Sequence, residues 1–103
     1  MRKSTGVEII EGSGNIFIDL GFSPTEARNL HIRSEMVTAL RNFILTEGLT
    51  KAAAAKRLGA SQARISDLLR GKLSQFSLDA LVNMLTDAGL EVDIRIKPAK
   101  RAA

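Results

Sequence analysis

The sequence contains no cysteine, so disulfide bonds and thiolate metal sites are excluded. This composition fits a reducing cytoplasm. His31 is the only histidine, and without a second histidine or a cysteine to share a metal ion we do not expect it to be a ligand. Tryptophan and tyrosine are absent, which leaves four phenylalanines as the aromatic residues. Stacking of exposed aromatics on unpaired bases, typical of RNA recognition, is therefore not expected.

Sequence patterns typical of enzyme active sites and of membrane insertion are also missing. The chain has no close pair of carboxylates expected to be buried, and its Gly12-Ser13-Gly14 segment is too short, and precedes no helix, to cradle a nucleotide phosphate. No apolar run approaches the ~20 residues that cross a membrane. Arg2 and Lys3 are followed by polar residues, unlike a signal peptide. We expect a cytoplasmic protein that is not an enzyme and needs no cofactor.

The positive charge is concentrated in one segment. The 103 residues, a common size for one domain, carry a formal net charge of +4. Between Thr50 and Leu73 there are six basic residues and one acid, whereas the remainder has nine bases and ten acids. A solvated helical face is basic by chance in some proteins. Because this segment also carries the motif described next, we interpret it as a phosphate-facing surface.

This basic segment has the pattern of two short helices joined by a glycine turn. Thr50 and Ser61 are suitable N-caps, and Gly59 and Gly71 follow the two helices as residues that accept a left-handed conformation. This is the pattern of a helix-turn-helix motif. An ordinary αα-hairpin inside a helical core remains the alternative. The apolar positions predicted to face the core are Leu58, Ile65 and Leu68.

The segment from Thr50 to Gly71 resembles the helix-turn-helix of the lambda-repressor-like (XRE) regulators. With G-N-I-F-I-D-L-G before the helices and a strand-like tail after them, the whole chain resembles a small XRE subfamily. Many members of that subfamily are HigA-type antitoxins encoded beside RelE-like toxins. The resemblance implies a mostly α fold, a lambda-repressor-like bundle of about five helices with a short C-terminal β-strand.

The second helix of the motif is expected to lie in the major groove of DNA. Gln62 is suited to adenine, Arg70 to guanine and Ala63 to a thymine methyl group. The residues expected near the base edges are Gln62, Ala63, Ser66, Asp67 and Arg70. Those expected at phosphates are Lys51, Ser61, Arg64, Lys72 and Ser77. Ser77 is included because a helix N-terminus favours anions, although residues 72–77 also read as a simple connector.

Three parts are expected along the chain: residues 1–22 as an N-terminal arm with a short extended segment, residues 23–89 as the DNA-binding domain, and residues 90–103 as a strand and basic tail. Residues 1–14 are predicted to be a mobile arm. Residues 15–20 read as a short strand or an extended segment packed on the core, and serve either as a partner surface or as a flap over the core.

A long helix is predicted from Ser23 to Gly48. Ser23 is its N-cap, Pro24 suits the first helical position and Glu26 completes a capping box. Because such a helix is long for a small domain, a kink or break is plausible at residues 31–34. Ser77 is predicted to cap the last helix, which ends at Gly89.

The segment from Glu91 to Lys97 alternates polar and apolar residues, as a half-buried strand does, and Pro98 follows it. It can pair either with residues 15–20 or with its copy in a second subunit. Because a reader of two DNA half-sites needs a dimer, the second option is favoured. The expected dimerisation residues are Val92, Ile94 and Ile96.

Together these observations predict a homodimeric, sequence-specific repressor that binds a palindromic operator in double-stranded DNA and is located at the nucleoid. The resemblance implies an antitoxin of a type II toxin–antitoxin pair that represses its own operon and binds a RelE-like toxin. The alternative is a free-standing or phage-type XRE repressor with no toxin partner.

Overall fold

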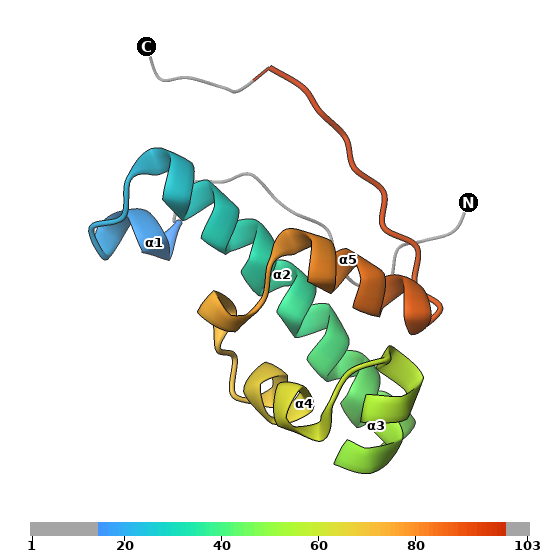
Figure 1. Cartoon of the computed structure of the whole chain (residues 1–103). Helices are drawn as coiled ribbons and strands as arrows, with labels where there is room; N and C mark the ends of the chain where they lie inside the picture. Colours follow the sequence, from blue (N-terminus) through green and yellow to red (C-terminus); the bar gives the residue numbers. More distant parts are fainter. Residues whose placement is uncertain (1–14, 99–103) are drawn as a thin grey trace.

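The computed structural model describes residues 15–98, and the predicted N-terminal arm at residues 1–14 lies outside this range. The described part is helical, and no β-strand occurs within it. A long central helix, α2, contacts α1, α4, α5 and the 3-10 turn η1, while α3 packs against α4 and α5 (Figure 1). The elements are α1 (Ile16–Asp19), α2 (Pro24–Glu47), α3 (Lys51–Leu58), α4 (Gln62–Leu69), η1 (Leu73–Gln75) and α5 (Leu78–Asp87).

The four N-caps predicted from the sequence are confirmed. The hydroxyl of Ser23 accepts the Glu26 backbone N–H at 3.2 Å, and Thr50 caps α3 in the same way. Ser61 and Ser77 each accept a backbone N–H three residues later, at 3.1 Å. Each hydroxyl thus satisfies a donor that has no partner within its helix, so the starts of these helices are fixed locally.

Helix α2 is continuous over 24 residues, so the break expected at residues 31–34 does not occur. It is supported by α1, η1, α4 and α5, so tertiary packing stabilises this long helix. Gly48 ends it in the left-handed conformation, with φ at 63°. The chain then turns into α3.

The core lies where α2, α3, α4 and α5 meet. Met36, Val37 and Ile44 line it from α2, and Phe76 enters it from the segment after α4. Among residues 15–98 no polar or charged side chain is buried. The predicted core residues Leu58, Ile65 and Leu68 are confirmed. The largest fully buried side chains are Leu40, Leu58, Ile65, Leu68 and Leu81.

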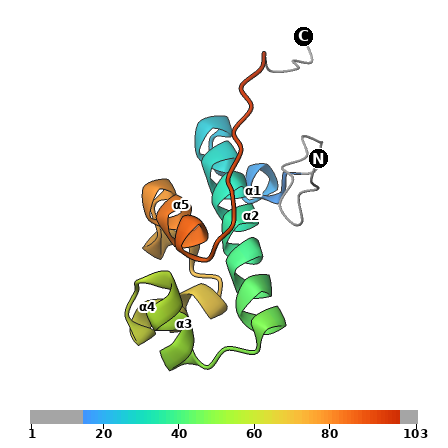
Figure 2. The ribbon, with the colours of Figure 1, turned by 90° about the vertical axis from the view of Figure 1, so that its right-hand side faces the viewer.

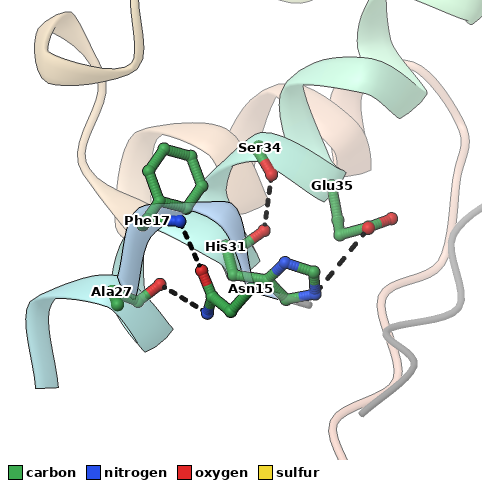
Figure 3. A network of polar contacts seen from close by, with 6 residues as sticks. All are labelled: Asn15, Phe17, Ala27, His31, Ser34 and Glu35. Carbon is green, nitrogen blue, oxygen red and sulfur yellow. Dashed lines mark hydrogen bonds and ion pairs between the residues drawn. The ribbon is translucent and has the colours of Figure 1, made fainter. Parts of the chain in front are cut away.

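The prediction of a strand or extended segment at residues 15–20 is wrong, because this stretch forms the one-turn helix α1. Alternating Ile and Phe favour a strand, but a lone strand leaves its backbone groups unpaired, whereas a helical turn pairs them locally. Asn15 caps α1 by accepting the Phe17 N–H at 2.9 Å and donates from Nδ2 to the Ala27 carbonyl of α2 at 3.2 Å (Figure 3). No residue of α1 is buried, so it does not act as a flap over the core.

The same region contains the only histidine. Nε2 of His31 lies 3.8 Å from Oε2 of Glu35, one turn later on α2, and the Ser34 hydroxyl donates to the His31 carbonyl at 2.8 Å (Figure 3). The His31 side chain is partly exposed, but its Nε2 atom is buried and has no hydrogen-bond partner among the described residues. Within the described residues there is no group of three side chains that could hold a metal ion.

The predicted C-terminal strand does not form within the described chain. Residues 91–98 are extended, but they pair with no other segment of residues 15–98. Figures 1 and 2 both show this tail leaving the end of α5 and running away from α3 and α4. Since residues 15–20 are helical, the alternative in which the two predicted strands pair within one chain is wrong.

Candidate nucleic-acid interface

Helices α3 and α4 form the pair predicted from the sequence. Gly59 ends α3 with φ at 63°, a left-handed conformation that favours glycine, and a Cβ there would lie 3.2 Å from the Asp87 carboxylate. Ala54 of α3 is fully buried where the helices meet. The tight turn and the small residue allow α4 to cross α3 closely, which leaves one face of α4 directed away from the core.

That outward face carries the residues predicted to read bases. Gln62 and Ala63 at the start of α4 are exposed, as is Arg70 at its end. Ser66 and Asp67 in the middle are partly buried. Ile65 and Leu68 point the opposite way, into the core. The face is polar and its side chains are mostly short, so a groove can approach the backbone of α4.

Two of the residues predicted at phosphates lie close to other parts of this surface. Nζ of Lys72 is 3.8 Å from Oδ1 of Asp67, which brings the loop after α4 to the proposed reading face. Arg64 is exposed, and one of its guanidinium nitrogens donates to the Gln75 carbonyl at 2.7 Å. Its guanidinium carbon also lies 5.1 Å from the centre of the Phe76 ring, a cation–π distance.

The remaining predicted phosphate contacts are spread around this surface. Lys51 is exposed at the first position of α3, and Ser61 and Ser77 are exposed at the starts of α4 and α5. Because Ser61 and Ser77 are N-caps, the backbone N–H groups around them are partly satisfied, yet each helix start remains open to an anion. The structure brings Arg64 together with the segment before Ser77, whereas Lys51 lies at the far end of α3.

Arg33 of α2 is a residue that sequence reasoning missed. One guanidinium nitrogen donates to the Leu73 carbonyl at 3.0 Å and to the Phe76 carbonyl at 3.2 Å. Nε donates to the Asn29 side chain at 2.6 Å, which fixes the plane of the guanidinium. The hydrogen bonds of Arg33 thus attach η1 to α2, while Arg64 of α4 contacts the same segment.

Phe76 lies in the segment that the sequence indicates as a connector, but its ring is buried and supports the Arg64 guanidinium. The signal that could have identified it is a large apolar residue between two helices, directly before the Ser77 cap. No comparable signal marks Arg33. It is one of several basic residues on a helix surface, and its partners are backbone carbonyls 40 and 43 residues away.

No helix among residues 15–98 has the length and apolar character needed to cross a membrane. The described surface carries a basic helix-turn-helix whose second helix presents a polar face, supported by η1 and Arg33. Its chemistry suits contact with a polyanion.

Comparisons with known proteins agree with this geometry. A family model described as a helix-turn-helix domain matches residues 16–97. A solved structure named for the XRE family of transcriptional regulators is similar to this chain, with 36% sequence identity and a TM-score of 0.67, and the match covers 76% of this chain and 90% of that one. No curated protein matches.

Proposed function

Because the chain belongs to the XRE family of helix-turn-helix transcriptional regulators, which bind DNA, we propose that it is a sequence-specific repressor that acts as a dimer. The observation that carries this proposal is the outward face of α4, which is polar and exposed at both ends while its opposite face is buried. A repressor of this kind acts at the nucleoid in the cytoplasm.

In the proposed complex α4 lies in the major groove. Gln62, Ala63, Ser66, Asp67 and Arg70 contact base edges, with Gln62 on adenine and Arg70 on guanine. Phosphates are held by the residues that surround this face, namely Lys51, Ser61, Arg64, Lys72 and Ser77. The position of Arg64, supported by Gln75 and Phe76, favours a phosphate contact of fixed geometry.

A shift assay tests this function with the DNA directly upstream of the protein's own gene. We expect a retarded complex that survives excess random DNA, and an affinity that falls steeply with salt because released counterions drive phosphate contacts. Equal competition by upstream and random DNA would count against sequence-specific repression of its own operon.

We further propose that the protein is an antitoxin whose partner is a RelE-like toxin. The resemblance to HigA-type antitoxins motivates this, and an exposed apolar surface around α1 supports it. Leu20 is 64% exposed and Ile16 57%, beside the more covered Ile18 and Phe22. A partner protein would bury this surface, as apolar interface cores require. The alternative is a free-standing or phage-type repressor with no toxin partner.

The neighbouring reading frame distinguishes these alternatives. A small basic protein encoded beside this gene should co-purify with the tagged chain, and Leu20→Asp should abolish that co-purification because it places a charge in the apolar contact. Leu45→Asp is the matched control. Leu45 is also exposed, but it lies near the C-terminal end of α2, away from the apolar surface around α1. Absence of any such neighbour would favour the free-standing repressor, whereas retention of the toxin by Leu20→Asp would contradict a toxin contact on the apolar surface around α1.

A further inference from the structure

We propose that residues 91–97 form an antiparallel two-stranded sheet with the same residues of a second copy, with Ile94 on the two-fold axis. The inference rests on the dimeric repressor proposed above and deepens it, because it names the segment, the orientation and the register of the contact.

The tail presents an unpartnered apolar edge. Ile94 is 73% exposed and Ile96 is 90% exposed, whereas Val92, at the base of the tail, packs against the core. In extended backbone these three side chains point to one face, because successive side chains alternate. Within residues 15–98 no segment pairs with this backbone. An extended segment with exposed isoleucines and open backbone groups is a template for strand addition.

The charges of the tail favour a second copy of the same tail as its partner strand. In an antiparallel pair centred on Ile94, Glu91 lies opposite the other copy's Lys97, and Asp93 lies opposite the other copy's Arg95. Two-fold symmetry repeats each pair, so every charged residue from 91 to 97 faces an opposite charge. Opposite charges across a ladder stabilise it, and like charges directly opposite destabilise it.

No other two-fold register within the tail has this property. Centring the pair on Asp93 or on Arg95 places that residue opposite its own copy, with like charges in contact. Centring it on Val92 sets the acids Glu91 and Asp93 opposite each other, and centring it two residues beyond Ile94 does the same with two bases. Because the registers centred on Asp93 and on Arg95 also place apolar residues opposite each other within residues 91–97, the charges decide between these registers and the one centred on Ile94.

The proposed ladder ends at the residues where the backbone has no free N–H group to donate to a partner strand. The Leu90 N–H already donates to the Leu85 carbonyl at 2.9 Å, where the chain leaves α5. Pro98 has no N–H to donate. In the register centred on Ile94, Leu90 and Pro98 fall opposite each other, so the ladder stops after Glu91 and Lys97 in both strands. Pairing there also leaves α4 uncovered, because the tail runs away from it (Figure 2).

Cysteine cross-linking tests the register, since the chain has no native cysteine. A cysteine on the two-fold axis meets its own copy at a separation that a disulfide can bridge, whereas a cysteine at 92 meets residue 96 of the other copy. With oxidised glutathione, Ile94→Cys should form roughly tenfold more cross-linked dimer than Val92→Cys or Ile96→Cys alone. A mixture of the latter two should restore cross-linking.

A charge exchange gives an independent readout by sedimentation. Asp93→Arg places bases opposite Arg95 twice per dimer and should lower the dimer fraction, while the double variant Asp93→Arg/Arg95→Asp should restore it. Failure of the double variant to recover, or equal cross-linking at 92, 94 and 96, would overturn the register. A monomeric chain would overturn the pairing.

These outcomes remain distinct from those for the repressor function. A dimeric chain that binds its upstream DNA but does not cross-link at position 94 overturns the pairing and leaves the proposed function standing. A chain that cross-links at position 94 but binds only random DNA supports the pairing and contradicts the proposed function.

Discussion

The body of the molecule from α2 to α5 and its two flanks, α1 and the tail, use apolar side chains in opposite ways. In the body Leu40, Leu58 and Leu68 are fully buried in one core. In the flanks Leu20 and Ile96 are largely exposed. Among residues 24–87 Leu45 is the one large apolar side chain that is exposed, whereas the flanks keep several that another chain can cover. This difference supports the proposal that the body contacts DNA and the flanks contact other protein chains.

The largest expected effect tests this contrast directly. Leu68→Ala removes a fully buried side chain of α4 and should lower the free energy of unfolding by about 2–5 kcal/mol. Ile96→Ala in the tail should change it by less than about 0.5 kcal/mol at concentrations where the chain is monomeric. Urea denaturation measures both. Similar losses for the two variants would remove the distinction between body and flanks.

Next in size is the loss of the Arg33 contacts. Arg33→Met leaves the Leu73 and Phe76 carbonyls without their charged donor, and should lower the free energy of unfolding by about 1–3 kcal/mol. It should also weaken operator binding, because η1 supports Arg64. Arg41→Met, an exposed position on the same helix, is the matched control and should have little effect on stability. Equal urea midpoints for Arg33→Met and Arg41→Met would contradict the role given to Arg33.

A substitution on the outward face of α4 should affect binding but not stability. Gln62→Ala should weaken binding to the preferred operator by ~1–3 kcal/mol and relax one base position, with an unchanged unfolding curve. Fluorescence anisotropy with operator and random duplexes measures the change. Equal losses on both duplexes would exclude base reading by Gln62.

Substitution of Arg64, on the same helix as Gln62, should lower affinity without changing sequence preference. Arg64→Ala should weaken binding to all sequences and flatten the salt dependence, because a phosphate contact is lost. Arg64→Lys keeps the charge but loses the planar group beside Phe76, so it should retain the salt dependence and only part of the affinity. A wild-type salt slope for Arg64→Ala would place Arg64 away from the phosphates.

The smallest expected effect is at a helix cap. Ser61→Ala removes the hydroxyl that accepts the Arg64 N–H and should lower the free energy of unfolding by about 1 kcal/mol. Ser61→Asp retains the acceptor but adds a negative charge where a phosphate is expected, so it should keep stability and lose DNA affinity. Thermal unfolding and anisotropy separate the two effects. An unchanged affinity for Ser61→Asp would show that α4 begins away from the DNA backbone.

Local signals explain how much of the body could be predicted from the sequence. Caps such as Thr50 and Ser61 and the turn at Gly59 act within a few residues, so the helix boundaries can be read from the local sequence without the tertiary contacts. The polar face of α4 follows from those boundaries and the helical period. The positions of its residues could therefore be inferred before their surroundings were known.

The flanks and Arg33 could not be predicted in the same way. Residues 16–19 have strand-like composition, but the absence of a partner strand made a helical turn the better state. The tail has a clear strand pattern, but a strand needs a partner that the described part of one chain does not supply. Arg33 depends on backbone carbonyls far along the sequence, which no local pattern marks.

Selection of bound duplexes from a random DNA pool shows whether the protein reads sequence and whether it does so as a dimer. We expect enrichment of a palindrome whose two half-sites are separated by about one helical turn or a multiple of it, because two copies of α4 enter successive major grooves. Enrichment of a single half-site would contradict the dimeric reader, and absence of any enriched sequence would contradict sequence-specific reading by α4.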